Sequence, residues 1–179
     1  MALTAHVALL RAVNVGGRKA TSADLRALMA ELGVEDGRTL LQSGNLVFRS
    51  EDGGAALEAR IETAFAARFG FASDVLVRDA GQWRAIAAAN PLGEMAERDP
   101  AHLVVMPLKD KPAAAGLKAL REWIPGRETV EAVGRELYLA YPDGIGESKL
   151  TIAVIERRLG VRGTGRNWNT VLKLAAMLD

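Results

Sequence analysis

The sequence predicts an α+β fold made of two ferredoxin-like (βαββαβ) units with antiparallel sheets and an extra C-terminal helix. Short apolar runs alternate with stretches that have helical spacing, and turn residues pair neighbouring runs into hairpins. The same order of elements then occurs a second time. We therefore assign residues 1–79 to an N-terminal unit, 80–100 to a bridging helix and linker, and 101–179 to a C-terminal unit with the added helix.

The first unit is predicted from strand, cap and turn signals. Its predicted elements are a buried strand at 6–11, a helix from Thr21 to 32, a hairpin of 39–41 with 46–48, a helix at 57–69 and a strand at 75–77. Thr21 and Asp24 form a capping-box pattern, and Gly33 is placed to end the first helix. Gly70 is placed to end the second helix.

The second unit has the same rhythm but a weak closing strand. Its predicted elements are a strand at 103–106, a helix around 117–123, a hairpin of 129–133 with 136–141 and a helix from about 148 to 159. A final helix is expected to carry inward Trp168, Val171, Leu172, Ala175 and Leu178. Between the units, 82–90 is predicted as a helix and 91–100 as a linker rich in Pro, Gly and charge.

Composition narrows the classes of function. The chain has 179 residues, 49% of them hydrophobic, which is enough for a core, and a net charge of +1, which gives no overall field toward nucleic acid or an anionic membrane. The absence of cysteine excludes disulfides and thiolate chemistry. His6 and His102 have no partner at a ligand spacing, so we predict no metal site. With no apolar run of membrane-spanning length and no signal region, we expect a cytoplasmic protein without a membrane partner.

Four polar, Gly- or Asn-containing segments stand where strand-like and helix-like patterns meet: 11–19, 42–45, 141–149 and 166–170. Such junctions can present backbone N–H groups and fixed side chains to a ligand. We therefore predict an interdomain polar cleft for a small anionic or nucleotide-like ligand. The candidate ligand-binding residues are Arg11, Asn14, Gly16, Gly17, Gln42, Ser43, Asn45, Lys149, Arg166, Asn167, Asn169 and Lys173.

The first two segments each have a structural and a functional interpretation. The glycines of 11–19 allow a tight turn or a close approach to a ligand, although the spacing is not that of a P-loop. Arg11 ends an apolar strand, so its guanidinium either pairs with a carboxylate such as Asp143 or binds a phosphate or carboxylate. The segment 42–45 is first of all a hairpin turn, from which Gln42 and Asn45 can still reach a ligand.

The last two segments are expected to form helix starts. Ser148 is a natural N-cap, and the helix N-terminus beside Lys149 would attract an anion. Asn167 or Asn169 can cap the final helix, while Trp168 is expected to pack inward.

These motifs together resemble one protein family. Segments 9–17, 42–45, 141–146, 148–151 and 166–171 read LLRAVNVGG, QSGN, YPDGIG, SKLT and RNWNTV. In this order, over essentially the whole chain, they resemble the bacterial family called domain of unknown function 1697. The resemblance implies the same architecture of two ferredoxin-like units and implies no activity.

Three functions remain open at this point. The first is a binding protein for a small anionic ligand. The second is an enzyme of phosphoryl transfer or hydrolysis that uses Lys149, Asp143 or Ser43 with a bound cation. The third is single-stranded nucleic-acid binding. The low aromatic content of 5% argues against it, because such binding relies on bases that stack on aromatic side chains. The cofactor, the reaction and the oligomeric state are left open.

Overall fold

The computed structural model describes residues 2–42 and 44–179 and divides into two compact units. One unit is Met1–Ala85 together with Leu174–Asp179, and the other is Ile86–Lys173. The division falls inside two helices, α3 (Ala80–Ala88) and α7 (Trp168–Ala176).

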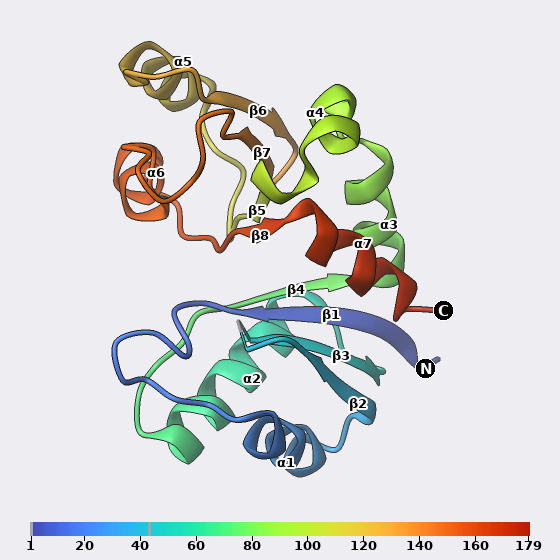
Figure 1. Cartoon of the computed structure of the whole chain (residues 1–179). Coiled ribbons are helices and arrows are strands. Elements are labelled where there is room, and N and C mark those ends of the chain that lie inside the picture. The colour runs from blue at the N-terminus through green and yellow to red at the C-terminus, as the bar shows by residue number, and fades with distance from the viewer. Residues whose placement is uncertain (1, 43) are drawn as a thin grey trace. The chain divides into compact units, whose positions relative to one another are not determined.

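The first unit has the predicted βαββαβ order. Its elements are β1 (Thr4–Leu10), α1 (Ser22–Leu32), β2 (Glu35–Leu40), β3 (Asn45–Ser50), α2 (Gly54–Phe69) and β4 (Val75–Asp79). The strands pair antiparallel in the order β2-β3-β1-β4, and α1 and α2 lie on one face of this sheet (Figure 1). The predicted α+β class is confirmed.

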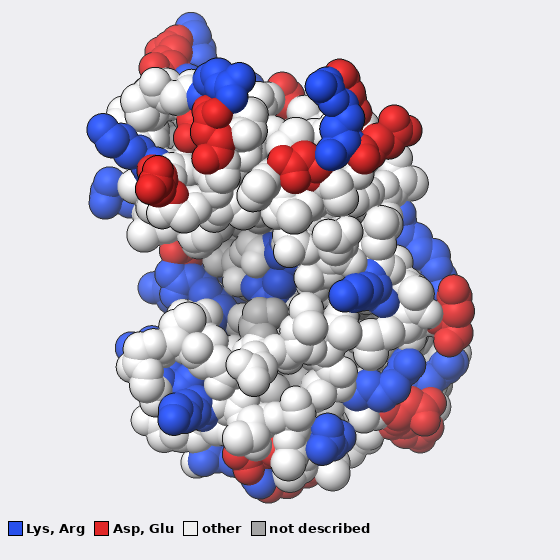
Figure 2. Space-filling model, viewed as in Figure 1, with Lys and Arg blue, Asp and Glu red and all other residues white. Residues whose placement is uncertain are grey.

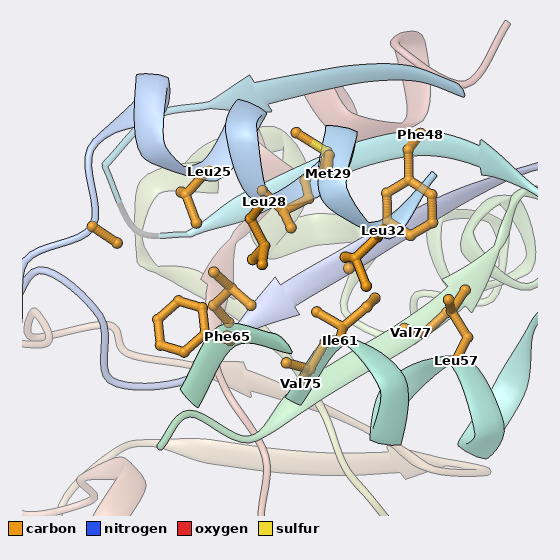
Figure 3. Packing of buried hydrophobic residues seen from close by; sticks show 14 of the residues in the cluster. Leu25, Leu28, Met29, Leu32, Phe48, Leu57, Ile61, Phe65, Val75 and Val77 are labelled. Atoms are coloured by element: carbon orange, nitrogen blue, oxygen red, sulfur yellow. The ribbon is translucent and has the colours of Figure 1, made fainter. Parts of the chain in front are cut away.

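The core of this unit fills the space between the two helices and the sheet (Figure 3). Apolar side chains at helical spacing on α1 and α2 meet alternate residues of the strands, because side chains of a strand point to opposite faces in turn. The predicted cap of α1 is present, since Thr21 Oγ1 accepts a hydrogen bond from Asp24 N at 3.1 Å. The labelled core residues are Leu25, Leu28, Met29, Leu32, Phe48, Leu57, Ile61, Phe65, Val75 and Val77.

The outer edge of β4 is closed by carboxylates of α2. Glu62 Oε2 accepts from Val75 N at 3.2 Å, and Glu58 Oε2 accepts from Val77 N at 2.8 Å. Arg78 is buried beside them, with Nη1 4.0 Å from Glu58 Oε2. The two acids thus satisfy backbone donors that an edge strand would otherwise present to another chain.

The last residues of the chain pack within the first unit. Arg38 Nη2 donates to the carbonyl oxygen of Met177 at 2.6 Å, and Arg84 Nη2 donates to Asp179 Oδ1 at 2.7 Å. Leu178 is buried. The C-terminal residues are therefore held by hydrogen bonds from two arginines and by the burial of Leu178.

The second unit repeats the arrangement. After α4 (Gly93–Arg98) and a 3₁₀ turn η1 (Pro100–His102), its elements are β5 (Leu103–Pro107), α5 (Ala114–Trp123), β6 (Thr129–Val133), β7 (Glu136–Ala140), α6 (Ile152–Leu159) and β8 (Arg166–Asn167). The strand order β6-β7-β5-β8 is equivalent to that of the first sheet. The closing strand, weak in the sequence, has two residues.

Three local predictions for this unit are wrong. The helix predicted from Ser148 begins at Ile152, because Thr151 Oγ1 caps it by accepting from Val154 N at 3.2 Å. The segment 91–100, expected to be a linker, contains α4 and η1. Leu172 is 46% exposed, and the inward position on α7 belongs instead to Leu174, which is one helical turn beyond Val171.

Among the described residues, no helix is both long and apolar enough to cross a bilayer.

Candidate functional site

The Gly-Gly pair of the first segment forms a two-residue hairpin turn. Arg18 N donates to Val15 O at 3.0 Å, and Asn14 N donates to Arg18 O at 2.6 Å. Gly16 and Gly17 have φ values of 55° and 83°, and the turn type that joins strands this tightly needs positive φ at both central residues. The glycines are therefore required by the turn itself.

Asn14 connects the first two predicted segments. Its Oδ1 accepts from Ala20 N at 2.8 Å, while its Nδ2 donates to Ala20 O at 3.0 Å and to Gln42 O. The amide thereby closes its own loop and holds it against the β2–β3 turn. Asn14 contributes to any site here by fixing the shape of both loops.

Arg11 has a carboxylate partner, but not the one that we expected. Its Nη1 lies 3.8 Å from Asp74 Oδ2, and the residue before β4 is adjacent because Leu10 pairs with Val75 across the sheet. Asp143 belongs to the second unit, where Arg127 holds it through both carboxylate oxygens. Hydrogen bonding to Arg127 lowers the pKa of Asp143.

The second segment mainly builds its hairpin. Asn45 is fully buried, and its Nδ2 donates to Leu40 O at 2.8 Å across the turn. Gln42 is exposed. Ser43 lies outside the described residues.

The third and fourth segments meet at a hollow of about 360 Å³ within the second unit. It lies where the β7–α6 loop, the start of α6, β5 and the start of β8 come together. The lining is mainly apolar, with Thr151 and Asn167 as polar members. The lining residues are Val104, Tyr141, Ile145, Leu150, Thr151, Ile152, Gly165 and Asn167.

Only one predicted residue of the fourth segment lines this hollow. Asn167 faces it and also caps α7, since its Oδ1 accepts from Thr170 N at 3.0 Å. Arg166 lies between two lining residues, so strand alternation turns its side chain to the other side. There Arg166 Nη1 donates to Thr164 Oγ1 at 2.8 Å and to Gly165 O at 2.9 Å, and burial lowers its pKa to about 10.

The three remaining candidates of this unit are exposed: Lys149, Asn169 and Lys173. Lys149 directly precedes Leu150 and Thr151, which line the hollow, but it is not itself one of the lining residues. Asn169 and Lys173 are one helical turn apart on α7, as their spacing predicted.

Two tyrosines are buried in the second unit with their hydroxyl groups bonded. Tyr141, in the wall of the hollow, donates to Leu150 O at 2.8 Å, and Tyr138 donates to Ile86 O at 2.6 Å. Burial raises the pKa of each to about 12, and the charges of Glu128 and Glu136 act in the same direction on Tyr141 and Tyr138, respectively.

This burial predicts a loss of stability at high pH. In the unfolded chain a tyrosine releases its proton near pH 10, whereas the folded protein keeps both protons until about pH 12. The two neutral tyrosines therefore contribute their full stabilisation below pH 10. As the pH rises above 10, the free energy of unfolding decreases, by about 1 kcal/mol per tyrosine at pH 11. Urea unfolding at pH 9 and 11 checks this. In a Tyr138→Phe/Tyr141→Phe variant the decrease should shrink, and an unchanged decrease would contradict the assignment.

One polar pair was missed in the sequence. His102 Nδ1 lies 2.7 Å from Asp99 Oδ2, a carboxylate three residues earlier, which was the available signal. The statement that His102 lacks a partner is therefore wrong. The described residues nevertheless contain no group of three or more His, Cys, Asp or Glu side chains placed to hold a metal ion.

The strand orders and the loop ends define an α+β protein of two ferredoxin-like units, each with polar loops gathered at strand ends. The chain belongs to the family described as Protein of unknown function (DUF1697), whose model matches residues 3–138. The predicted family is thereby confirmed, and of the motifs that indicated it, segments 9–17 and 42–45 lie within the matched residues.

A solved structure has the same fold along nearly the whole chain. It is titled the structure of conserved bacterial protein SP0830 from Streptococcus pneumoniae. The two sequences are 25% identical, the alignment covers 99% of this chain and 100% of that chain, and the TM-score is 0.79. No curated protein matches the chain.

Proposed function

We propose that this protein binds a small molecule that has an apolar body and an anionic group, such as a phosphate or carboxylate. The observation that carries the proposal is the hollow at the start of α6, whose volume of about 360 Å³ is in the range of small-molecule sites. Two of the four predicted polar segments contribute to it. The sequence also placed the site at strand-to-helix loops, but as an interdomain polar cleft, whereas this hollow lies within the second unit and has a mainly apolar lining.

The electrostatics of the rim support an anion. Thr151 and Ile152 place the N-terminus of α6 at the hollow, where the helix dipole contributes about 0.3–1 kcal/mol toward a negative group. Lys149 adds an exposed positive charge beside it. The apolar lining would bury the rest of the ligand.

Thermal shift and calorimetry test this proposal. Inorganic phosphate, nucleoside monophosphates and short-chain carboxylates are the probes, and we expect at least one to raise the melting temperature. Lys149→Ala should weaken its binding about twofold to fivefold, since one exposed charge next to a helix terminus is lost. Lys118→Ala is the control, because Lys118 is an exposed lysine on α5, a helix that contributes no residue to the hollow, and the affinity of this variant should equal that of the wild type. Equal losses in both variants, or no shift with any probe, would reject the site.

The alternative functions find less support in the same geometry. Asp143, a candidate base, is held by Arg127, and the strand aromatics Phe48 and Tyr138 are buried and offer no base-stacking surface. Over α4 and α5 of the second unit, Figure 2 shows acidic and basic side chains interspersed. Such mixed charge makes these two helices a poor surface for a phosphate backbone.

A further inference from the structure

Two neighbouring loops of the first unit carry the most exposed large apolar side chains among the described residues. Val15, in the β1–α1 loop, is 56% exposed, and Leu41, directly after β2, is 53% exposed. The hydrogen bond from Asn14 Nδ2 to Gln42 O joins the residues next to them in the chain. Residues 12–19 and 41–42 are called the loop pair below. A contiguous exposed apolar patch marks an interaction surface, and the bond between Asn14 and Gln42 brings together the two loops that carry these side chains.

Hydrogen bonds to the backbone hold the β1–α1 loop of the loop pair in its conformation. Val15 stands at the start of the tight turn closed by Arg18, and Asn14 anchors that turn to Ala20. Leu41 has a φ of 59°, a left-handed conformation that leucine rarely adopts. The fold therefore holds an apolar side chain outward in a strained conformation, and strain of this kind collects at binding sites.

The loop pair is also cationic, in contrast to the nearly neutral chain. The loop pair contains Arg18 and Lys19 and no acidic residue, whereas Arg11, which precedes it, pairs with Asp74. Arg18 and Lys19 are exposed on the same hairpin as Val15. Apolar tips are thus flanked by positive charge, which is complementary to an anionic surface.

We propose that the loop pair docks on an anionic lipid surface. Val15 and Leu41 enter the interfacial layer, and Arg18 and Lys19 lie at the level of the lipid phosphates. Aliphatic side chains beside cations are the chemistry of peripheral membrane attachment, whereas stacking on nucleic-acid bases requires aromatic side chains. Attachment is weak and reversible, since only two side chains are buried. This surface is independent of the hollow proposed above, so either can fail alone.

Sedimentation with lipid vesicles tests the proposal. The full chain should bind vesicles of equal phosphatidylcholine and phosphatidylglycerol, bind pure phosphatidylcholine much less, and dissociate at high salt. Leu41→Asn removes the apolar tip with a residue that accepts positive φ, and it should lower the affinity about tenfold. Lys19→Gln should lower it about fivefold.

The control is Leu172→Asn, which removes a leucine 46% exposed on α7 and should leave vesicle binding unchanged. Melting temperatures of all variants show that the fold is intact. Three results would overturn the proposal: equal binding to neutral vesicles, wild-type binding by Leu41→Asn, or an equal loss in Leu172→Asn. A protein that binds no vesicles at all also overturns it and would direct attention to an acidic protein partner.

Discussion

Replacing Glu58 by alanine is expected to lower the free energy of unfolding by about 3–5 kcal/mol, because it breaks a buried ion pair from one side. Glu58 is 7% exposed, and its Oε2 accepts a hydrogen bond from Val77 N at 2.8 Å and lies 4.0 Å from Arg78 Nη1. Arg78 is 1% exposed, so water does not replace the lost charge. Urea unfolding of the purified variant measures the effect.

Two further variants separate charge from hydrogen bonding. Glu58→Gln keeps an acceptor for Val77 N and removes the charge, so its loss should be intermediate. Glu62→Ala removes an equivalent acceptor, for Val75 N at 3.2 Å, at a half-buried position and should cost about 1 kcal/mol. If Glu58→Ala lowered the free energy of unfolding no more than Glu62→Ala does, the buried ion pair would add nothing to stability beyond the hydrogen bond to the strand.

Replacing Gly44 by alanine is expected to cost about 3 kcal/mol, the sum of backbone strain and overpacking. Gly44 has a φ of 83°, which a side chain disfavours. A Cβ there would lie 2.5 Å from Val13 Cγ2 and 2.8 Å from Leu10 Cβ, inside the core. The backbone cannot withdraw easily, since Leu10 N donates to Gly44 O at 2.8 Å.

Gly17 offers a matched control for this substitution. It has the same φ of 83°, but a Cβ there would meet no atom within 4 Å. Gly17→Ala should therefore cost about 1 kcal/mol, the strain alone. Thermal and urea unfolding of both variants measure the difference, and equal losses would show that packing around Gly44 relaxes freely.

The elements that the sequence predicted well are those with local signals. The start of α1 follows from Thr21 and Asp24, and the hairpin at Gly134 follows from turn residues between two apolar runs. The start of α6 was misplaced because two residues, Ser148 and Thr151, both have the chemistry of an N-cap. Tertiary contact decides between them, since Ser148 Oγ donates to Glu128 Oε1 at 2.7 Å, twenty positions away in the chain.

The sequence likewise predicted only part of the candidate site. The residue types and the strand-to-helix positions of the polar segments stand in the sequence, which is why Asn167 and the loop before α6 could be chosen. The sequence did not indicate that Arg166 turns away from the hollow or that the amide of Asn14 is bonded to backbone.

The amino-acid sequence by itself determined the α+β class, the doubled βαββαβ arrangement and the family, because these follow from short-range periodicity and from the order of the motifs. Only the tertiary structure decided which partner each polar side chain has: Asp74 rather than Asp143 for Arg11, and Arg127 for Asp143. A hydrogen bond or ion pair depends on distances of a few ångströms between segments far apart in sequence, and those distances are set by strand register and helix packing.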